Sequence, residues 1–179
     1  LVSVSNNAIA MPFNGRLGIL HSPVHPGFSA GYADRINRSQ SHQLFFALKL
    51  GYFFQQRVQH AIHCHPEIGY RFKVKGGFGI ETRVGAGYMH SVPDLQQFKL
   101  ANNGGYERRG RWGKPSLLGS LVVGVGYDLE KRFSMPMYLF TQYQVWLQSP
   151  FVRSYVPILP NATLHIGSSF YFRKNKKTE

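Results

Sequence analysis

The sequence predicts an all-β protein, an eight-stranded antiparallel up-and-down transmembrane β-barrel that takes in residues 1–173. Segments of about ten residues or more place apolar side chains at every second position, which is the period of a β-strand. Short and long breaks between these segments follow one another in strict turn, as in barrels that cross a membrane. Charged residues make up only 16 % of the chain, well below the quarter that is typical of soluble domains.

The composition agrees with a single membrane-exposed domain. The chain has 179 residues, enough for one domain and few for two. Phenylalanine and tyrosine are frequent, with 14 and 10 copies, yet the mean hydropathy is only −0.23. Barrels give such a low value because only alternate residues face lipid. The single cysteine, Cys64, rules out an internal disulfide. No signal peptide is visible, so we expect the mature form of an exported chain.

The positions of the breaks define eight strands. The short breaks are residues 37–41, 75–77 and 130–132, and the long ones are roughly 55–61, 93–115 and 149–161. An even number of strands places both termini on the side of the short turns. The strands are expected at 15–21, 27–36, 42–55, 61–74, 78–92, 116–129, 134–148 and 162–173, the first being the least regular.

The clearest strand shows what the two faces are made of. In residues 78–88, apolar side chains such as Ile80 and Val84 fall on one face, and glycines with Glu81 and Arg83 fall on the other. A soluble barrel or sandwich also alternates, but it would show water a face rich in Lys, Glu, Ser and Thr. Small residues instead suit the narrow lumen of an eight-stranded barrel, which side chains fill.

The last strand resembles the C-terminal signature of bacterial outer-membrane barrels. Residues 164–172 alternate and end on the aromatic Phe172. The aromatic-rich lipid face is also similar to that of small eight-stranded barrels of Bacteroidetes type, with no particular subfamily indicated. The resemblance implies a bacterial outer membrane with both termini in the periplasm. In that family the aromatic residue ends the chain, whereas here residues 174–179 follow as an expected short basic periplasmic tail.

The net charge of +13, from 21 Lys and Arg against 8 Asp and Glu, favours an anionic partner. Nucleic acid is one such partner, but the sequence has no nucleic-acid motif and no basic helix. In an outer membrane the phosphates of lipopolysaccharide, or an acidic protein, suit this charge. We therefore expect contact with membrane lipid, lipopolysaccharide and other outer-membrane proteins, and none with nucleic acid.

The inward face carries charges of both signs. Charges in so narrow a lumen need partners, because an isolated charge away from water costs several kcal/mol. The sequence therefore favours a salt-bridged plug that closes the bore, and a gated ion path is the alternative. The residues of this lumen charge network are Lys49, Glu67, Arg71, Glu81, Arg83 and Asp128.

A histidine cluster offers a metal site. His63, His65 and Glu67 occupy alternate positions and so share one strand face. Imidazole and carboxylate ligands suit zinc or copper. Pro66 lies inside the same strand and could shift the alternation. Without a cofactor, the imidazoles would simply hydrogen-bond across the barrel mouth. A third ligand would have to come from a neighbouring segment, and the candidates are His25, His60 and His90.

Catalysis is the second alternative, because some small outer-membrane barrels modify lipid A as acyl hydrolases or transferases. The deacylases carry His-x-Ser, which puts both groups on one strand face and lets the histidine take the serine proton. Here His90 and Ser91, like His21 and Ser22, are adjacent and point to opposite faces. The His-x-Ser motif of these deacylases is absent from this chain, so we expect no catalytic residues.

Two long breaks carry the expected contacts with a partner or with lipopolysaccharide. One is basic and glycine-rich, and the other is apolar and stiffened by prolines. A stiff apolar loop either docks a partner or folds over the barrel as a lid. The candidate contact residues are Arg108, Arg109, Arg111 and Trp112 in the first break and Phe151, Tyr155 and Ile158 in the second.

The function predicted from the sequence is that of a non-enzymatic barrel, an accessory or docking subunit of a larger outer-membrane transport or assembly complex. The alternatives are a barrel that binds a metal or another ligand through its histidines, and an enzyme that modifies lipid A.

Overall fold

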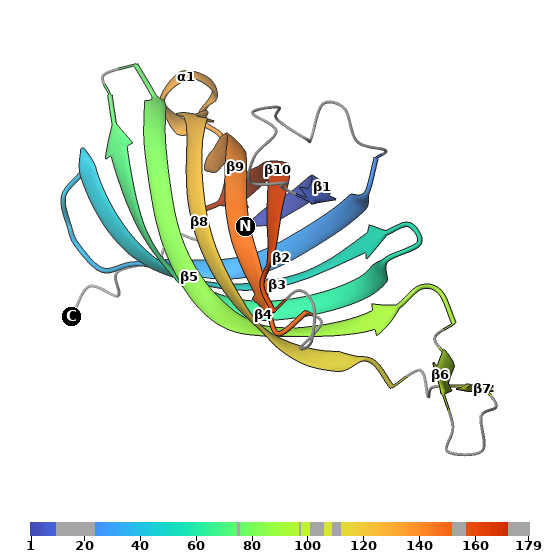
Figure 1. Cartoon of the computed structure of the whole chain (residues 1–179). Coiled ribbons are helices and arrows are strands. Elements are labelled where there is room, and N and C mark those ends of the chain that lie inside the picture. The colour runs from blue at the N-terminus through green and yellow to red at the C-terminus, as the bar shows by residue number, and fades with distance from the viewer. Residues whose placement is uncertain are drawn as a thin grey trace, which may run out of the picture.

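The computed structural model contains a closed antiparallel barrel of eight strands (Figure 1). It describes residues 1–9, 24–74, 76–96, 98–100, 106–108, 112–151 and 157–171. Around the barrel the strand order is β1-β10-β9-β8-β5-β4-β3-β2. The barrel strands are β1 (Val2–Ile9), β2 (Pro26–Arg35), β3 (His42–Gln55), β4 (Gln59–Lys73), β5 (Phe78–Pro93), β8 (Lys114–Asp128), β9 (Met137–Ser149) and β10 (Leu159–Phe170).

Two small elements lie in the connections between barrel strands. Strands β6 (Phe98–Leu100) and β7 (Tyr106–Arg108) form a hairpin between β5 and β8, beyond the barrel wall (Figure 1). A four-residue helix, α1 (Glu130–Phe133), lies between β8 and β9. No helix in the described ranges is long and apolar enough to cross a membrane.

The barrel confirms the predicted fold class and corrects its first strand. The first barrel strand is β1, over Val2–Ile9, and not residues 15–21, which lie outside the described residues. The segment 2–9 combines Val2 and Val4 with polar Asn6 and Asn7, so its sequence alternates poorly. Its place is set by pairing with β10 on one side and β2 on the other. The predicted barrel limit at 173 and the basic tail 174–179 also lie outside the described residues.

A second correction concerns the predicted long break at 55–61. Strands β3 and β4 continue until Gln55 pairs with Gln59, which leaves only the turn 56–58 between them. Arg57 takes the left-handed conformation that so tight a turn needs, with φ 64°. Polar residues at the ends of these strands are typical of a loop, so the sequence alone predicts a longer break here.

The barrel has two distinct ends, which we call the terminal end and the loop end. The terminal end holds Leu1 and Tyr171, with the connections 36–41, 74–77 and 129–136. The loop end holds the turn 56–58 and the connections 10–25, 94–113 and 150–158. Leu1 and Tyr171 therefore share one side of the barrel, as an even number of strands requires.

Alternation separates a lumen face from an outer face along every long strand. In β3 the residues of odd number are buried and those of even number are partly or fully exposed. The strand around Pro66 keeps this alternation, because Cys64 pairs with Tyr88 and Glu67 with Gly85 in one continuous register. A Cβ at Gly79 would lie 2.8 Å from the Tyr138 hydroxyl oxygen, so glycine here makes room for an aromatic ring in the lumen.

Candidate functional site

The centre of the lumen is built around the carboxylate of Glu67. It accepts hydrogen bonds from Lys49 Nζ at 3.1 Å, from His65 Nε2 at 2.9 Å and from Arg83 Nη1 at 3.2 Å. Strands β3, β4 and β5 are neighbours. The alternation along each strand turns these side chains into the lumen, at the same height along the barrel axis. All four residues are at most 2 % exposed, so the ion pairs lie away from water.

A second carboxylate, Glu81, extends this network toward the terminal end. It accepts from Arg83 Nε, from Arg71 Nε at 2.7 Å and from Gln142 Nε2 at 3.1 Å. Arg83 therefore bridges both carboxylates. Charge-assisted hydrogen bonds of this kind are stronger than neutral ones. They also fix the relative positions of the strands that carry them.

Aromatic rings cover the arginines on the terminal side. The Arg71 guanidinium lies 4.0 Å from the centroid of the Tyr138 ring. Tyr171, just beyond β10, accepts from Arg71 Nη1 at 3.3 Å and from Lys73 Nζ at 3.4 Å. Burial raises the pKa of Tyr171 to about 12, so its hydroxyl stays protonated at neutral pH. Lys73 also pairs with Asp128 at 2.6 Å.

The loop half of the lumen is closed by uncharged side chains. Phe53, Met89, Leu118 and Trp146 form a buried apolar cluster. Beyond it, Gln59 Nε2 donates to Gln148 Oε1 at 3.1 Å. A cavity of about 20 Å³ lies beside this cluster. Its volume is enough for about one water molecule. From the loop end inward, an amide layer, an apolar layer and an ionic layer thus follow one another along the bore.

The structure brings together most of the predicted lumen network. Lys49, Glu67, Arg71, Glu81 and Arg83 form one connected group. Asp128 stands apart from that group and pairs with Lys73, while the Tyr171 hydroxyl links Lys73 to Arg71. The alternation along each strand already predicts which charged side chains point inward. The roles of Tyr138 and Tyr171 were missed, because aromatic side chains do not by themselves indicate contact with a lumen charge.

His63 and His65 lie together, but as hydrogen-bonding groups. His65 Nε2 is engaged by Glu67, and its Nδ1 lies 3.2 Å from His63 Nδ1. In the described part of the chain, no group of three or more His, Cys, Asp or Glu side chains is arranged to hold a metal ion. A zinc or copper site at His63, His65 and Glu67 stays a prediction, without a three-ligand arrangement to support it.

The three histidines expected as a third ligand lie elsewhere. His60 and His90 fall on the outer face, whereas the pair points inward. His60 contacts Asp94, with 3.4 Å between Nε2 and Oδ1. His25 is buried at the loop end, where its Nδ1 lies 3.0 Å from the Asn7 carbonyl oxygen. Alternation alone could have assigned His60 and His90 to the outside.

Tyrosine–histidine pairs mark both edges of the outer face. Near the loop end, Tyr52 bonds to His60 at 2.8 Å, and Tyr88 bonds to His90 at 3.0 Å. At the terminal end, the corresponding pair is His42 with Tyr70, at 2.6 Å. Rings with one apolar and one polar edge are typical of membrane–water interfaces.

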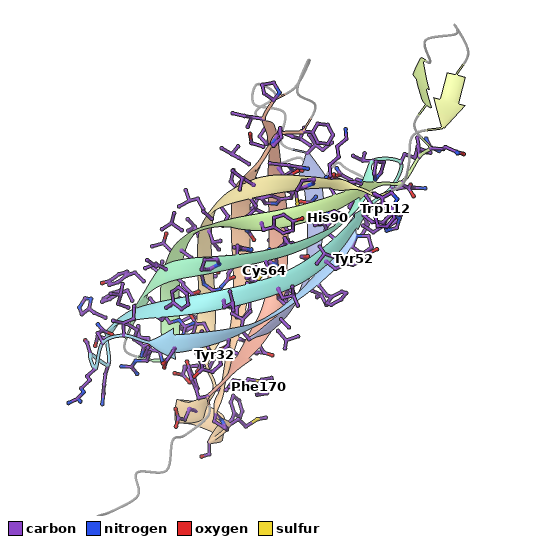
Figure 2. The ribbon with its side chains drawn as sticks, turned by 90° about the horizontal axis from the view of Figure 1, so that it is seen from below. Tyr32, Tyr52, Cys64, His90, Trp112 and Phe170 are labelled. Atoms are coloured by element: carbon purple, nitrogen blue, oxygen red, sulfur yellow. The ribbon has the colours of Figure 1, made fainter. Side chains whose placement is uncertain are left out.

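The spacing of these pairs matches a bilayer. His60 and Tyr70 are ten positions apart on β4, about 34 Å along a strand. A strand tilt of about 40° reduces this to about 25 Å, the height of the apolar band on outer-membrane barrels. Figure 2 shows Tyr52 and His90 toward one end of the barrel, Tyr32 and Phe170 toward the other, and Cys64 between them. The residues between the pairs are apolar and exposed, among them Leu48, Leu50, Ile80, Val84, Leu121 and Val123.

The described parts of the two long connections leave large side chains uncovered. Trp112 is 92 % exposed, and its carbonyl oxygen lies 2.9 Å from His90 Nε2. Ile158 is exposed, and Phe151 N donates to the Pro157 carbonyl oxygen at 3.2 Å. The backbone of Arg108 ends β7. Of the other predicted contact residues, Arg109, Arg111 and Tyr155 lie outside the described residues.

Solved structures of three outer-membrane proteins share this fold. The Neisserial surface protein A (NspA) matches over 96 % of this chain and 93 % of its own, with a TM-score of 0.57 and 13 % identity. The outer membrane enzyme PagL matches over 93 % of this chain and 97 % of its own, with a TM-score of 0.50 and 9 % identity. Ail, the attachment invasion locus protein of Yersinia pestis, matches over 96 % and 95 %, with a TM-score of 0.50 and 12 % identity.

No protein-family model and no curated protein matches the chain. Identities as low as those of the three structures establish a shared fold and nothing finer. The chain is therefore a small eight-stranded barrel of the type found in bacterial outer membranes, without a subfamily.

Proposed function

We propose that this chain is a non-conducting barrel of a bacterial outer membrane that serves as an accessory or docking subunit of a larger transport or assembly complex. The observation that carries the proposal is the filled lumen. Its charges are paired and its loop half is closed by an apolar cluster. A barrel that cannot pass solutes through its bore has its outer surface and its connections left for function.

The apolar and ionic layers that fill the lumen favour a plug over a gated ion path. Water would have to cross the cluster of Phe53, Met89, Leu118 and Trp146, whose side chains are at most 5 % exposed. The charges on the terminal side of that cluster are bound to one another. Eight strands give an interior that side chains just fill.

The loop end is the docking surface in this proposal. Exposed Trp112 and Ile158 lie there, and Trp112 directly follows the basic stretch 108–111 in the sequence. Tryptophan and arginine are enriched among the residues that dominate binding energy. The longer connections gather at the loop end, which favours an external loop end and periplasmic termini. Lipopolysaccharide phosphates and an acidic protein are the partners that suit this basic end, and no nucleic acid or catalysis is proposed.

Planar-bilayer recording tests the closed lumen. The purified barrel, refolded in detergent and added to the bilayer, is expected to give no conductance steps above those of detergent alone. The same preparation must show a folded barrel by its heat-dependent shift in gel mobility. Reproducible single-channel steps from folded protein would contradict the plug and favour the ion path.

The native mass of the barrel, extracted from its own membrane in mild detergent, tests the docking role. We expect it to co-elute with defined larger membrane proteins. Trp112→Ala is expected to weaken this association, whereas Met135→Ala, an exposed apolar residue at the terminal end, should leave it unchanged. A lone barrel of its own mass, or equal effects of the two variants, would overturn the docking proposal.

A further inference from the structure

The three tyrosine–histidine pairs of the outer face differ in how the second imidazole nitrogen is used. At the loop end, His60 Nε2 lies 3.4 Å from Asp94 Oδ1. His90 Nε2 lies 2.9 Å from the carbonyl oxygen of Trp112, and these two residues are toward the same end of the barrel in Figure 2. Each imidazole at the loop end therefore joins its tyrosine to a second group of the protein.

The pair at the terminal end leaves one imidazole nitrogen available. His42 Nδ1 is bonded to the Tyr70 hydroxyl at 2.6 Å, and the imidazole and the Phe72 ring lie 5.0 Å apart, centroid to centroid. When the phenol donates to Nδ1, the proton of a neutral imidazole is on Nε2, and a protonated imidazole also carries one there. His42 Nε2 has no partner among the described residues. It can therefore donate to a group outside the protein.

The turn before His42 supplies a cation that is not used by the protein. Asn37 Nδ2 donates to the His42 carbonyl oxygen at 2.6 Å, and Asn37 Oδ1 accepts from the Leu44 N–H at 3.0 Å, so the turn is fixed by its own polar groups. Arg38 is exposed, and in the described part of the chain its guanidinium makes no hydrogen bond or ion pair. The connection 36–41 contains no carboxylate, and the nearest one in the sequence is Asp34, on the outer face of β2.

Apolar side chains lead from this edge toward the middle of the membrane. Leu44, Phe46 and Leu48 follow one another on the outer face of β3, and Phe46 pairs with Ile68 of β4. All four are exposed, so in a bilayer they contact acyl chains. A lipid whose chains lie along these residues has its head group beside His42.

We propose that His42 and Arg38 bind the phosphate of an anionic phospholipid in the leaflet at the terminal end, with the acyl chains against the outer face of β3 and β4. Interfacial tyrosines lie at the level of the lipid head groups, so the Tyr70 pair is at the depth of the phosphates. Hydrogen bonds from a guanidinium to a phosphate are charge-assisted and strong. The site is at the terminal end, so it does not depend on the docking role proposed for the loop end.

Photo-crosslinking in phosphatidylcholine nanodiscs tests the site. The probe is a small share of phosphatidylglycerol with a diazirine on its head group, and labelled residues are mapped by mass spectrometry of peptides. Label at the terminal end is expected to concentrate on the segments 36–44 and 70–72. Label spread evenly over all the connections of that end would overturn the proposal. Heat-dependent gel mobility shows that each variant tested is a folded barrel.

Two matched pairs of variants test the residues. Arg38→Gln is expected to lower the label at 36–44 roughly fivefold, the effect of one basic residue near an anionic membrane surface. Arg132→Gln, the same change in another connection of the terminal end, should leave that label unchanged. His42→Phe keeps an aromatic ring without the donor and should also lower the label, whereas His60→Phe should not. Equal effects within either pair would mean that the membrane is attracted by net charge or by aromatic rings alone, and would contradict the site.

Competition separates the phosphate from the acyl chains. Unlabelled phosphatidylglycerol and phosphatidic acid should displace the probe from the segment 36–44. Diacylglycerol, which lacks the phosphate, and glycerol phosphate, which lacks the chains, should not. Displacement by diacylglycerol as strong as that by phosphatidylglycerol would reduce the site to an apolar surface. Displacement by glycerol phosphate would show a site for a free anion. Either result would overturn the proposal of a phospholipid site.

Discussion

Glu67 is the residue on which the lumen network most depends. Three donors on three strands meet its carboxylate, and all are buried. A buried ion pair adds little net stability, because desolvation offsets the attraction between the charges. Removing one partner is different, since the remaining charges stay buried without compensation. The network therefore specifies register more than it stabilises the barrel.

The first prediction is that Glu67→Gln strongly destabilises the barrel. Lys49 and Arg83 would remain buried beside a neutral amide, and the expected loss is about 3–5 kcal/mol in the free energy of unfolding. Guanidinium titration in lipid vesicles, followed by tryptophan fluorescence, measures it. Asp34→Asn removes an exposed carboxylate and is expected to have no measurable effect. Equal stability of the two variants would mean that the charges of the lumen are not interdependent.

The histidines show what the alternation along a strand can predict and what it cannot. Alternation places the side chains of His63 and His65 in the lumen and that of His60 outside, as in the structure. It does not say that His65 uses both ring nitrogens within the lumen, at Glu67 and beside His63. Such contacts depend on rotamers and on neighbouring strands, which a single strand does not specify.

At the scale of the element, β8 shows how glycines divide the two faces. A Cβ at Gly126 would meet the carbonyl oxygen of Leu139 and lie 2.5 Å from the Tyr138 ring. A Cβ at Gly119, on the outer face of the same strand, would meet nothing within 4 Å. The first glycine is required by the packing of the lumen, and the second faces lipid.

The second prediction compares leucine at these two positions. Gly126→Leu is expected to prevent barrel formation, because overpacking against backbone and a ring costs at least about 1–3 kcal/mol. Gly119→Leu should fold with stability equal to or above that of the parent chain, since it adds apolar surface toward lipid. Heat-dependent gel mobility after refolding reports both. Folding of Gly126→Leu at the yield of Gly119→Leu would show that the lumen is looser than described.

At the scale of the whole molecule, the outer face defines how the barrel lies in a bilayer. The tyrosine–histidine pairs at the two edges enclose a band of exposed apolar side chains. Leu121 lies near the middle of that band on β8, and Phe78 lies at its terminal edge. The cost of a charge on a barrel surface depends on depth in the membrane. The two positions therefore test the placement.

The third prediction is a depth-dependent cost of arginine. Leu121→Arg is expected to destabilise the folded barrel by about 2–4 kcal/mol, and Phe78→Arg by about 0–1 kcal/mol. Each is compared with the alanine variant at the same position, so that the loss of the apolar side chain cancels. Equilibrium unfolding in vesicles is the measurement. A similar cost at both positions would place the band elsewhere on the barrel.

The three proteins that share this fold include the outer membrane enzyme PagL and the Neisserial surface protein A. A fold found in proteins so different does not decide between docking, ligand binding and catalysis. The filled lumen and the exposed loop end are properties of this chain, and the proposed function rests on them.

The sequence by itself determined the fold class, seven of the eight barrel strands and the inward or outward side of most residues. Side-chain direction has a period of two residues, so it can be read locally wherever a strand is regular. Lys49, Glu81 and Arg83 were identified as lumen residues for that reason.

Only the tertiary structure decided how the strands come together. It placed Val2–Ile9 as the first strand, paired Asp128 with Lys73 and kept the register through Pro66. Each of these depends on register between strands that are distant in sequence. Register is set by hydrogen bonds and side-chain packing across the barrel, and no single strand contains that information.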